Sequence, residues 1–392
     1  MNSYDFYAPV RVLFGEGSLK KLHTLEMPGK KALLVISNGK SAKMNGSLAA
    51  TEDELTKAGV SYVIYNGIGA NPLKSAVEKG AKVGRENGAD FVVALGGGSV
   101  MDAAKNIAMF IPQPSDDLWD YTFGLHGGKK TPENPVLPWI AITTSAGTGS
   151  EADAAGVITN PDTFEKIGVG GFPGMFATYA IVDPTLMKTV PQAYTAYQGF
   201  DALFHSVEGY ISNRHNLMGD MVQRAAIENI GKYLPRAVKD GNDMEARERV
   251  AFANTMSGYS MDVTACTSEH SMEHAMSAYH QHLPHGAGLI MLSREYFSFW
   301  INKHVCDDRF VDMAKFLGKE NATKPEDFIT ALTDLQKACG VADLKMSDYG
   351  IQKEEAMTLA KNARETMGRL FACDPAETID EEIAGIYERA YK

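Results

Sequence analysis

The chain has 392 residues, of which 44% are apolar and 22% charged, a composition typical of a soluble globular protein with about two domains. Its formal net charge of −11 argues against nucleic acid or an anionic membrane as the main partner, because both attract clustered Lys and Arg. The four cysteines are scattered, the N-terminus lacks a signal peptide's apolar segment, and no apolar run approaches the ~20 residues that span a bilayer, so we expect a cytoplasmic protein.

The first half of the chain alternates short apolar runs with helical segments. The apolar runs have the length of buried strands and cover residues 31–37, 60–65, 91–95 and 139–143. Between them, residues 48–58 and 73–87 have the length and periodicity of helices. Strands that alternate with helices form parallel sheets covered on both faces, so residues 1–184 are predicted to be an α/β domain with a Rossmann-like sheet.

The second half is dominated by segments with helical period. The clearest cover residues 201–213, 220–234, 246–264, 268–279, 325–339 and 353–369. Strand-like runs are scarce there, so residues 185–392 are predicted to be an all-helical domain. We place the boundary near Asp183 and Pro184, where a proline and a turn interrupt the pattern.

A glycine-rich loop, residues 96–99, follows the strand predicted at 91–95 and precedes a helix that we expect to begin near Val100. Glycines let the backbone approach a ligand, and a helix N-terminus offers unpaired N–H groups to a phosphate. The loop matches neither Gly-x-Gly-x-x-Gly nor a Walker A motif, so a simple tight turn is the competing interpretation.

A second loop, residues 143–151, is rich in Thr, Ser and Gly and also follows a predicted strand. Its small polar residues suit hydrogen bonds to a cofactor's ribose or amide, and a solvated loop is the alternative. Ligands of open α/β sheets bind beyond the carboxyl ends of the strands. Two such loops in one sheet therefore favour a phosphate-bearing cofactor.

Four residues of the second half have the spacing of a metal site. Asp201 and His205 are four apart, so on a helix they share one face. Half of the ten histidines fall between His270 and His285, and His285 is expected in a loop that leads into a helix. One carboxylate and three imidazoles suit a divalent ion such as Fe²⁺ or Zn²⁺. The spacing predicts a site built from two helices and a loop.

Two other functions fit parts of this pattern. His270-Ser-Met-Glu-His274 matches His-x-x-Glu-His, the zinc signature of a class of metallopeptidases, and indicates a hydrolase. That interpretation leaves the glycine loops, Asp201 and His205 unexplained. A non-catalytic metal-binding protein is the third possibility, if the four ligands close off the ion.

In combination, these motifs closely resemble the iron-dependent (group III) alcohol dehydrogenase family, which includes butanol dehydrogenases and lactaldehyde reductases. The resemblance runs nearly end to end through residues 9–17, 96–105, 144–151, 183–184, 199–210 and 270–288. It implies a dehydroquinate synthase-like fold, in which a dinucleotide-binding α/β domain precedes an all-helical metal domain and the active site lies between them. It also implies hydride transfer between a small primary alcohol, or its aldehyde, and NAD(P), and a homodimer.

The resemblance carries the family's functional residues onto this chain. The implied metal ligands are Asp201, His205, His270 and His285, with Fe²⁺ expected and Zn²⁺ or Mn²⁺ compatible. The implied cofactor-binding residues are Asn38, Gly39, Ser41, Gly97, Gly98, Ser99, Asp102, Thr144, Ser145, Thr148 and Lys166. Within this set, residues 97–99 hold the pyrophosphate, residues 144–148 lie near the nicotinamide, and Lys166 lies near a ribose.

The choice between the two nucleotides depends on Gly39. Strict NAD enzymes of the family carry an aspartate at this position, which accepts the ribose 2′-hydroxyl and repels a 2′-phosphate. Here Gly39 stands with Lys40, Ser41 and Lys43 nearby, so we predict that NADP(H) is accepted beside NAD(H).

Proton delivery requires a titratable group near the metal. His274 lies one helical turn after His270 and either relays a proton or orients a ligand. His280, rather than His282, is predicted to touch the substrate. Asp153 faces either the substrate or solvent.

Overall fold

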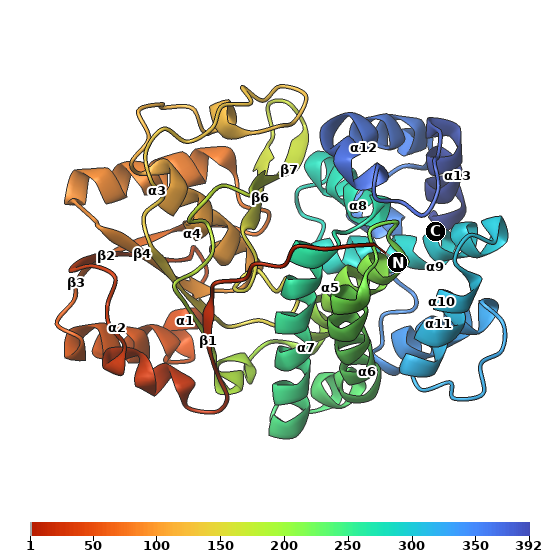
Figure 1. Cartoon of the computed structure of the whole chain (residues 1–392), viewed down its shortest axis with the longest axis horizontal. Helices are drawn as coiled ribbons and strands as arrows, with labels where there is room; N and C mark the ends of the chain where they lie inside the picture. The colour runs from red at the N-terminus through yellow and green to blue at the C-terminus, as the bar shows by residue number, and fades with distance from the viewer. Residues whose placement is uncertain (1) are drawn as a thin grey trace.

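The computed structural model describes residues 2–392, with a sheet half (residues 2–184) on one side of the molecule and a helical half (residues 185–392) on the other (Figure 1). The sheet half is built on six parallel strands in the order β1-β8-β5-β4-β2-β3. Their bounds are β1 Arg11–Phe14, β2 Lys31–Ser37, β3 Ser61–Ile68, β4 Phe91–Gly96, β5 Trp139–Thr143 and β8 Tyr179–Val182.

The inner strands are apolar because helices cover both faces of the sheet. Every residue of β4 and β5 is buried, which explains why their sequences are continuous apolar runs rather than alternating ones. Successive residues of β2 enter opposite cores: Leu33 packs with α3 (Lys74–Asn87) and α4 (Gly98–Phe110), and Leu34 packs with α2 (Ser47–Lys57). The predicted α/β sheet is therefore confirmed.

The order of the strands positions the ligand loops. After β2 the chain moves outward to β3, and after β4 it moves the opposite way to β5, so the direction reverses between β2 and β4. A crevice opens at such a switch point, beyond the carboxyl ends of the strands. The loops that follow β2, β4 and β5 meet at this edge.

Several elements of the sheet half have no strong periodicity and were not predicted. They are the edge strand β1 and its neighbour β8, the short helix α1 (Ser41–Met44), and the antiparallel hairpin of β6 (Ala155–Asn160) and β7 (Glu165–Gly170). The hairpin lies between the sheet and helices α8 and α12 (Figure 1). Strand β7 of the hairpin therefore places Lys166, a residue of the sheet half, beside helix α8 of the helical half.

Nine α-helices make up the described part of the helical half. They are α5 Gln192–Ile211, α6 Leu217–Lys239, α7 Met244–Val263, α8 Ser268–Tyr279, α9 His285–Lys303, α10 Asp307–Phe316, α11 Glu326–Ala338, α12 Ala356–Phe371 and α13 Asp380–Ala390. Aromatic side chains fill the core between them, including Phe204, Tyr296, Phe297 and Trp300. The predicted helical half is confirmed, including the helix expected after His285, which is α9, whereas α10 and α13 were not predicted.

Short 3₁₀ helices connect the main elements: η1 Ser18–Thr24, η2 Leu118–Tyr121, η3 Pro184–Met187, η4 Met346–Tyr349 and η5 Lys353–Glu355. The predicted boundary near Pro184 falls at the start of η3, and the division into two domains there stays a prediction. Within residues 2–392, none of the helices combines the length and the apolar character needed to cross a membrane.

Candidate metal and nucleotide site

Helix α5 presents the first two candidate ligands. Asp201 and His205 lie one turn apart, both side chains are buried, and Asp201 Oδ1 is 3.4 Å from His205 Nδ1. The i, i+4 spacing of the sequence therefore places both on one face of the helix, as predicted.

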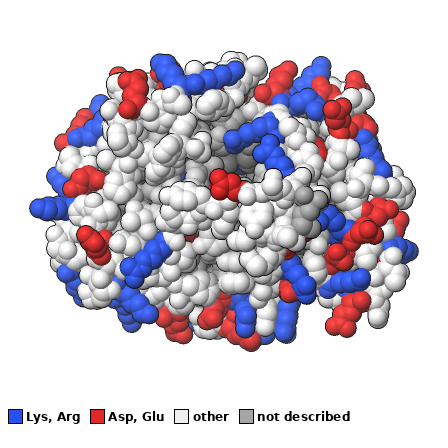
Figure 2. Space-filling view, in the orientation of Figure 1, with Lys and Arg blue, Asp and Glu red and all other residues white. Residues whose placement is uncertain are grey.

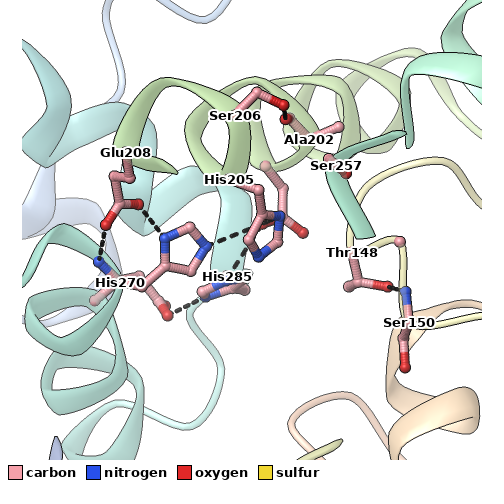
Figure 3. Close-up of polar contacts among 12 residues, drawn as sticks. Thr148, Ser150, Ala202, His205, Ser206, Glu208, Ser257, His270 and His285 are labelled. Carbon is pink, nitrogen blue, oxygen red and sulfur yellow. Dashed lines mark hydrogen bonds and ion pairs between the residues drawn. The ribbon is translucent and has the colours of Figure 1, made fainter. Parts of the chain in front are cut away.

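Helices α8 and α9 supply the other two. His270 lies in the first turn of α8, and His285 is the first residue of α9, directly after its N-cap residue Pro284. The Nε2 atoms of His270 and His285 are each 3.5 Å from Asp201 Oδ1. Figure 3 shows the rings of His205, His270 and His285 gathered around one point. The site is thus built from three helices, and the expected loop position of His285 was wrong.

The atoms that face this point lack partners. Asp201 Oδ1, His205 Nδ1 and His270 Nε2 are buried and accept or donate no hydrogen bond within residues 2–392. Leaving buried polar atoms unpaired is costly, and a divalent cation would satisfy all of them at once. Candidate ligand atoms of Asp201, His270 and His285 lie within 4.8 Å of one another, and His205 is grouped with His270 in the same way. The four residues therefore fit a divalent metal ion.

Two buried glutamates form hydrogen bonds with the Nδ1 atoms of His270 and His285, on the side of each ring away from the candidate metal position. Glu208 is hydrogen-bonded to His270 Nδ1, and Glu273 to His285 Nδ1 (Figure 3 shows the former pair). Because a carboxylate accepts only, each Nδ1 carries the proton, and each Nε2 offers its lone pair to the cation. The glutamates thus select the tautomer that a metal ligand needs.

The four candidate ligands differ in their pKa shifts. Burial opposes ionisation of Asp201, but the His205 and His285 rings outweigh it and hold its pKa well below the ordinary value. Burial, reinforced by His270, lowers the pKa of His205 to about 3, so this ring is neutral at pH 7. Burial disfavours protonation of His270 and His285 too, but Cys266 and Glu208 hold the pKa of His270 well above its ordinary value, and Glu273 raises that of His285. A bound cation would displace the Nε2 protons of these two rings, and one anionic ligand would then leave a divalent ion with a net positive charge.

The two glycine-containing loops pack against each other at the carboxyl ends of β4 and β5. A Cβ atom on Gly98, at the start of α4, would lie only 2.2 Å from Thr148 Cγ2, and one on Gly97 would lie 2.8 Å from Ser145 Oγ. Only glycine allows this approach, which leaves the N-terminus of α4 open toward the cleft. Ser99 and Thr148 line the same cavity, of about 410 Å³, as His205, His270 and His285.

Polar side chains beneath the loops hold them in place. Asp102 accepts hydrogen bonds from Ser150 Oγ (2.6 Å) and Val157 N (2.9 Å), and burial raises its pKa to about 6. Asp153 lines the cavity but pairs with the buried Lys105 at 2.6 Å. Asp102 and Asp153 thus tie the second loop to helix α4, and Asp153 does not point to open solvent.

The loop after β2 completes this edge of the sheet. Asn38, Gly39 and Ser41 are exposed, and Asn38 N donates to Ile68 O at 2.8 Å. Thr144 N donates to Gly96 O, also at 2.8 Å, which links the loops after β4 and β5. The predicted nucleotide residues of the three loops therefore share one edge. Lys166 comes instead from β7, and its Nζ donates to Glu273 Oε2 (3.2 Å) and Ser277 Oγ (2.7 Å).

The two histidines proposed for catalysis lie in different places. His274 is buried in the cavity, with its ring centroid 5.3 Å from that of His285 and its Nδ1 2.8 Å from Met367 Sδ. Burial, reinforced by Lys166, holds its pKa well below the ordinary value. His280 is the C-cap residue of α8 and places Nε2 3.1 Å from a Glu355 carboxylate oxygen, outside the lining of this cavity. The structure brings His274 to the site and does not bring His280 there.

Sequence reasoning missed the supporting groups of this site. Glu208 follows Asp201 by seven residues and His205 by three, so the i, i+4, i+7 spacing was a signal that all share a helix face. Glu273 entered only through the hydrolase alternative. Cys266, whose thiol lies among the candidate ligand atoms of His205 and His270, carried no sequence signal, and burial raises its pKa to about 11.

A parallel sheet with nucleotide-type loops, facing a cluster of one carboxylate and three imidazoles, is the arrangement of a metal-dependent dehydrogenase. Comparison with known families agrees. The model described as "Iron-containing alcohol dehydrogenase" matches residues 9–184, and "Fe-containing alcohol dehydrogenase family, C-terminal" matches residues 195–391. The chain belongs to the iron-containing alcohol dehydrogenase family.

Individual relatives extend over the whole chain. It is 31% identical to a 1,3-propanediol dehydrogenase of Klebsiella pneumoniae, with 99% of each chain covered. It is 30% identical to NADH-dependent butanol dehydrogenase A of Clostridium acetobutylicum, with 100% of each covered. An archaeal alcohol dehydrogenase from a Red Sea brine pool has a similar structure, with a TM-score of 0.91, 32% identity and 100% of both chains covered.

Proposed function

We propose that the protein catalyses reversible hydride transfer between a small primary alcohol, or its aldehyde, and NAD(P). One observation carries the proposal. The three histidines of the metal site and the loops at the carboxyl ends of β4 and β5 line the same cavity of about 410 Å³, and His205 Nδ1 and His270 Nε2 have no hydrogen-bond partner among the described residues. A substrate in this cavity would lie between the two groups that the reaction requires.

Asp201, His205, His270 and His285 are proposed to hold the metal ion, which we expect to be Fe²⁺, with Zn²⁺ or Mn²⁺ as possible substitutes. A divalent cation supplies Lewis-acid chemistry that polarises a carbonyl group or acidifies an alcohol. Glu208 and Glu273 keep the Nε2 lone pairs of His270 and His285 directed at the ion. These four ligands come from rigid helices, which fixes their geometry.

The nucleotide is proposed to lie along the sheet edge. The N–H groups at the start of α4, with Gly97, Gly98 and Ser99, would bind the pyrophosphate. Asn38, Gly39 and Ser41 would surround the adenosine ribose, and Thr144, Ser145 and Thr148 the nicotinamide half. The nicotinamide ring supplies or accepts the hydride. Asp102 positions the second loop, and Lys166 faces a ribose.

His274 is the proposed proton carrier. Its Nδ1 contacts a thioether, and its Nε2 has no hydrogen bond to any of the described residues. Because burial and Lys166 hold its pKa well below the ordinary value, the ring is neutral, and Nε2 would hold a proton from an alcohol or a cavity water only transiently before passing it on. His280 is not retained in this role, because Glu355 engages it outside the cavity.

Three further properties belong to the proposal. NADP(H) is accepted beside NAD(H), because Gly39 leaves room for a 2′-phosphate and Lys40, Ser41 and Lys43 are exposed nearby. The protein forms a homodimer in the cytoplasm. Residues 1–184 and 185–392 are the two domains.

The hydrolase alternative is not favoured. It requires His270 and His274 to bind one ion, yet within residues 2–392 no group of three or more candidate ligand atoms includes both. Its glutamate, Glu273, is occupied by Lys166 and His285. A non-catalytic metal-binding protein would not explain why the candidate metal ligands and the nucleotide loops line one cavity.

His270→Ala in anaerobically purified protein tests the proposal. We expect metal content and NAD(P)H-dependent reduction of butanal to be lost together, because the variant removes one metal ligand. It also removes the hydrogen-bond partner of Glu208 Oε1. His126→Ala, which changes an exposed histidine away from the cavity, is the matched control. Turnover retained at unchanged metal stoichiometry would remove His270 from the ligand set.

A further inference from the structure

Two arginines of the helical half line the cavity that holds the candidate metal site. Arg214 follows the end of α5, and Arg369 lies in the last turn of α12. Both side chains are exposed at the cavity mouth. In the view of Figure 2, basic side chains border a hollow in the region where Figure 1 places β7 beside α8 and α12.

Hydrogen bonds between the ends of α5 and α12 set the two arginines side by side. Ser212 Oγ and Asn213 N each donate to Cys373 O at 3.1 Å, and Asn213 Nδ2 donates to Ala372 O at 2.9 Å. Both guanidinium groups act on the pKa of the Cys373 thiol, which burial raises and the two cations lower. The arginines are therefore neighbours on one rim.

Neither guanidinium has an anionic partner in the described structure. Arg214 makes no side-chain hydrogen bond or ion pair within residues 2–392, and Arg369 makes only a 3.4 Å contact with Gly168 O. Elsewhere in this chain of net charge −11, Arg236 pairs with both Asp243 and Glu245. The two cations are free to bind an anion from outside.

The acids that share the cavity do not neutralise the arginines. Asp102 is held by Ser150 and Val157, and Asp153 by Lys105. Asp262 is largely buried, and burial, followed by the charge of Asp153, raises its pKa to about 8, so it is mainly protonated at pH 7. Among the described residues, none of these acids therefore forms an ion pair with Arg214 or Arg369.

Arg369 also lies close to the metal site. Arg369 lines the same cavity as Cys266 and the candidate ligands His205, His270 and His285. Cys266 in turn sits among the candidate ligand atoms of His205 and His270. A short substrate whose oxygen faces the metal ligands would thus direct its far end to Arg369 and Arg214.

We propose that Arg214 and Arg369 determine specificity by binding an anionic group, a carboxylate, sulfonate or phosphonate, at the far end of a short aldehyde or alcohol. This inference rests on the proposed function and narrows its substrate class. A guanidinium offers paired N–H donors whose spacing matches the oxygens of such anions, and hydrogen bonds to charged groups are stronger than neutral ones. The cofactor phosphates are assigned instead to the sheet edge, at the N-terminus of α4.

The test compares kcat/KM of the metal-loaded enzyme for butanal with kcat/KM for succinic semialdehyde, sulfoacetaldehyde and phosphonoacetaldehyde. We expect the enzyme to prefer at least one anionic aldehyde. Arg369→Gln should lower the ratio of the anionic to the neutral value by about 10- to 100-fold. Arg214→Gln should act in the same direction, and Arg369→Lys should lose less because it keeps the charge.

Arg364→Gln is the matched control, since Arg364 lies on the same helix but pairs with Asp380 outside the cavity. Calorimetric titration of the enzyme–NADP⁺ complex with succinate gives a readout that needs no turnover, and Arg369→Gln should weaken this binding by a similar factor. A parent enzyme that prefers butanal to all three anionic aldehydes would overturn the proposal. So would an Arg369→Gln variant that raises the KM for the nucleotide and leaves the aldehyde ratio unchanged. Failure to reduce any of the four aldehydes would instead refute the proposed function, while succinate binding would still report on the arginines.

Discussion

Replacing Glu208 with Gln should invert the tautomer of His270. Glu208 Oε2 accepts from Thr267 N (2.8 Å) and Thr267 Oγ1 (2.9 Å), while Oε1 pairs with His270 Nδ1. In Glu208→Gln the amide oxygen must stay with the two Thr267 donors, so the NH₂ group faces Nδ1. His270 then accepts at Nδ1 and carries its proton on Nε2, the atom that should bind the cation.

The size of the effect follows from this geometry. Loss of a partner that orients a metal-binding histidine costs 10- to 100-fold in affinity as a typical range, or about 1.4–2.7 kcal/mol. The metal-free protein should lose little stability, because the new Nε2–H points toward Asp201 Oδ1, 3.5 Å away. This variant should therefore bind the metal ion more weakly while the metal-free protein keeps nearly the same free energy of unfolding.

The assay is competition for Zn²⁺ between the protein and a chromophoric chelator, with thermal unfolding of the metal-free protein measured in parallel. Glu269→Gln is the matched control. Glu269 is buried in α8, next to His270 in the sequence, and both of its carboxylate oxygens lack hydrogen-bond partners among the described residues. Its metal affinity should match that of the parent. A Glu208→Gln variant that binds Zn²⁺ within about twofold of the parent would refute the tautomer argument.

Two further changes test other parts of the molecule. Gly39→Asp should fold normally, because the nearest atom to a Cβ there is Ser37 Oγ at 3.6 Å. The new carboxylate should lower kcat/KM for NADPH relative to NADH by about tenfold or more, measured by initial rates. Asp374→Asn tests a buried acid whose pKa is raised to about 7, mainly by burial. Between pH 4 and 7 the folded parent holds a proton that the unfolded chain has released, so parent stability falls with rising pH by about 1 kcal/mol per pH unit relative to the variant.

A specific outcome would contradict each of these two predictions. An unchanged NADPH-to-NADH ratio in Gly39→Asp would place the ribose away from the loop after β2. Chemical denaturation of Asp374→Asn and parent that shows a constant difference in unfolding free energy from pH 4 to 8 would mean that Asp374 ionises normally. The variant keeps Oδ1 as acceptor for Ser268 N, so loss of that hydrogen bond cannot mimic the pH effect.

Local patterns in the sequence were sufficient for the elements and for part of the site. The apolar runs of β4 and β5 predicted a buried parallel sheet, because strands covered on both faces have no polar side. The four-residue spacing of Asp201 and His205 predicted a shared helix face, because the helical period acts within a few residues. The family resemblance, also a property of the sequence, indicated how His270 and His285 join them.

Only the tertiary structure decided which distant segments meet. His280 is paired by Glu355, 75 residues away, and lies outside the lining of the cavity. Arg214 and Arg369 share a rim because α5 and α12 end against each other, and neither residue lies in a motif. Such contacts depend on the packing of whole helices, and the same short-range periodicity is compatible with many packings. The sequence therefore determined the elements and the residue types of the candidate metal site, whereas the folded chain determined the supporting carboxylates and the position of the arginines at the cavity mouth.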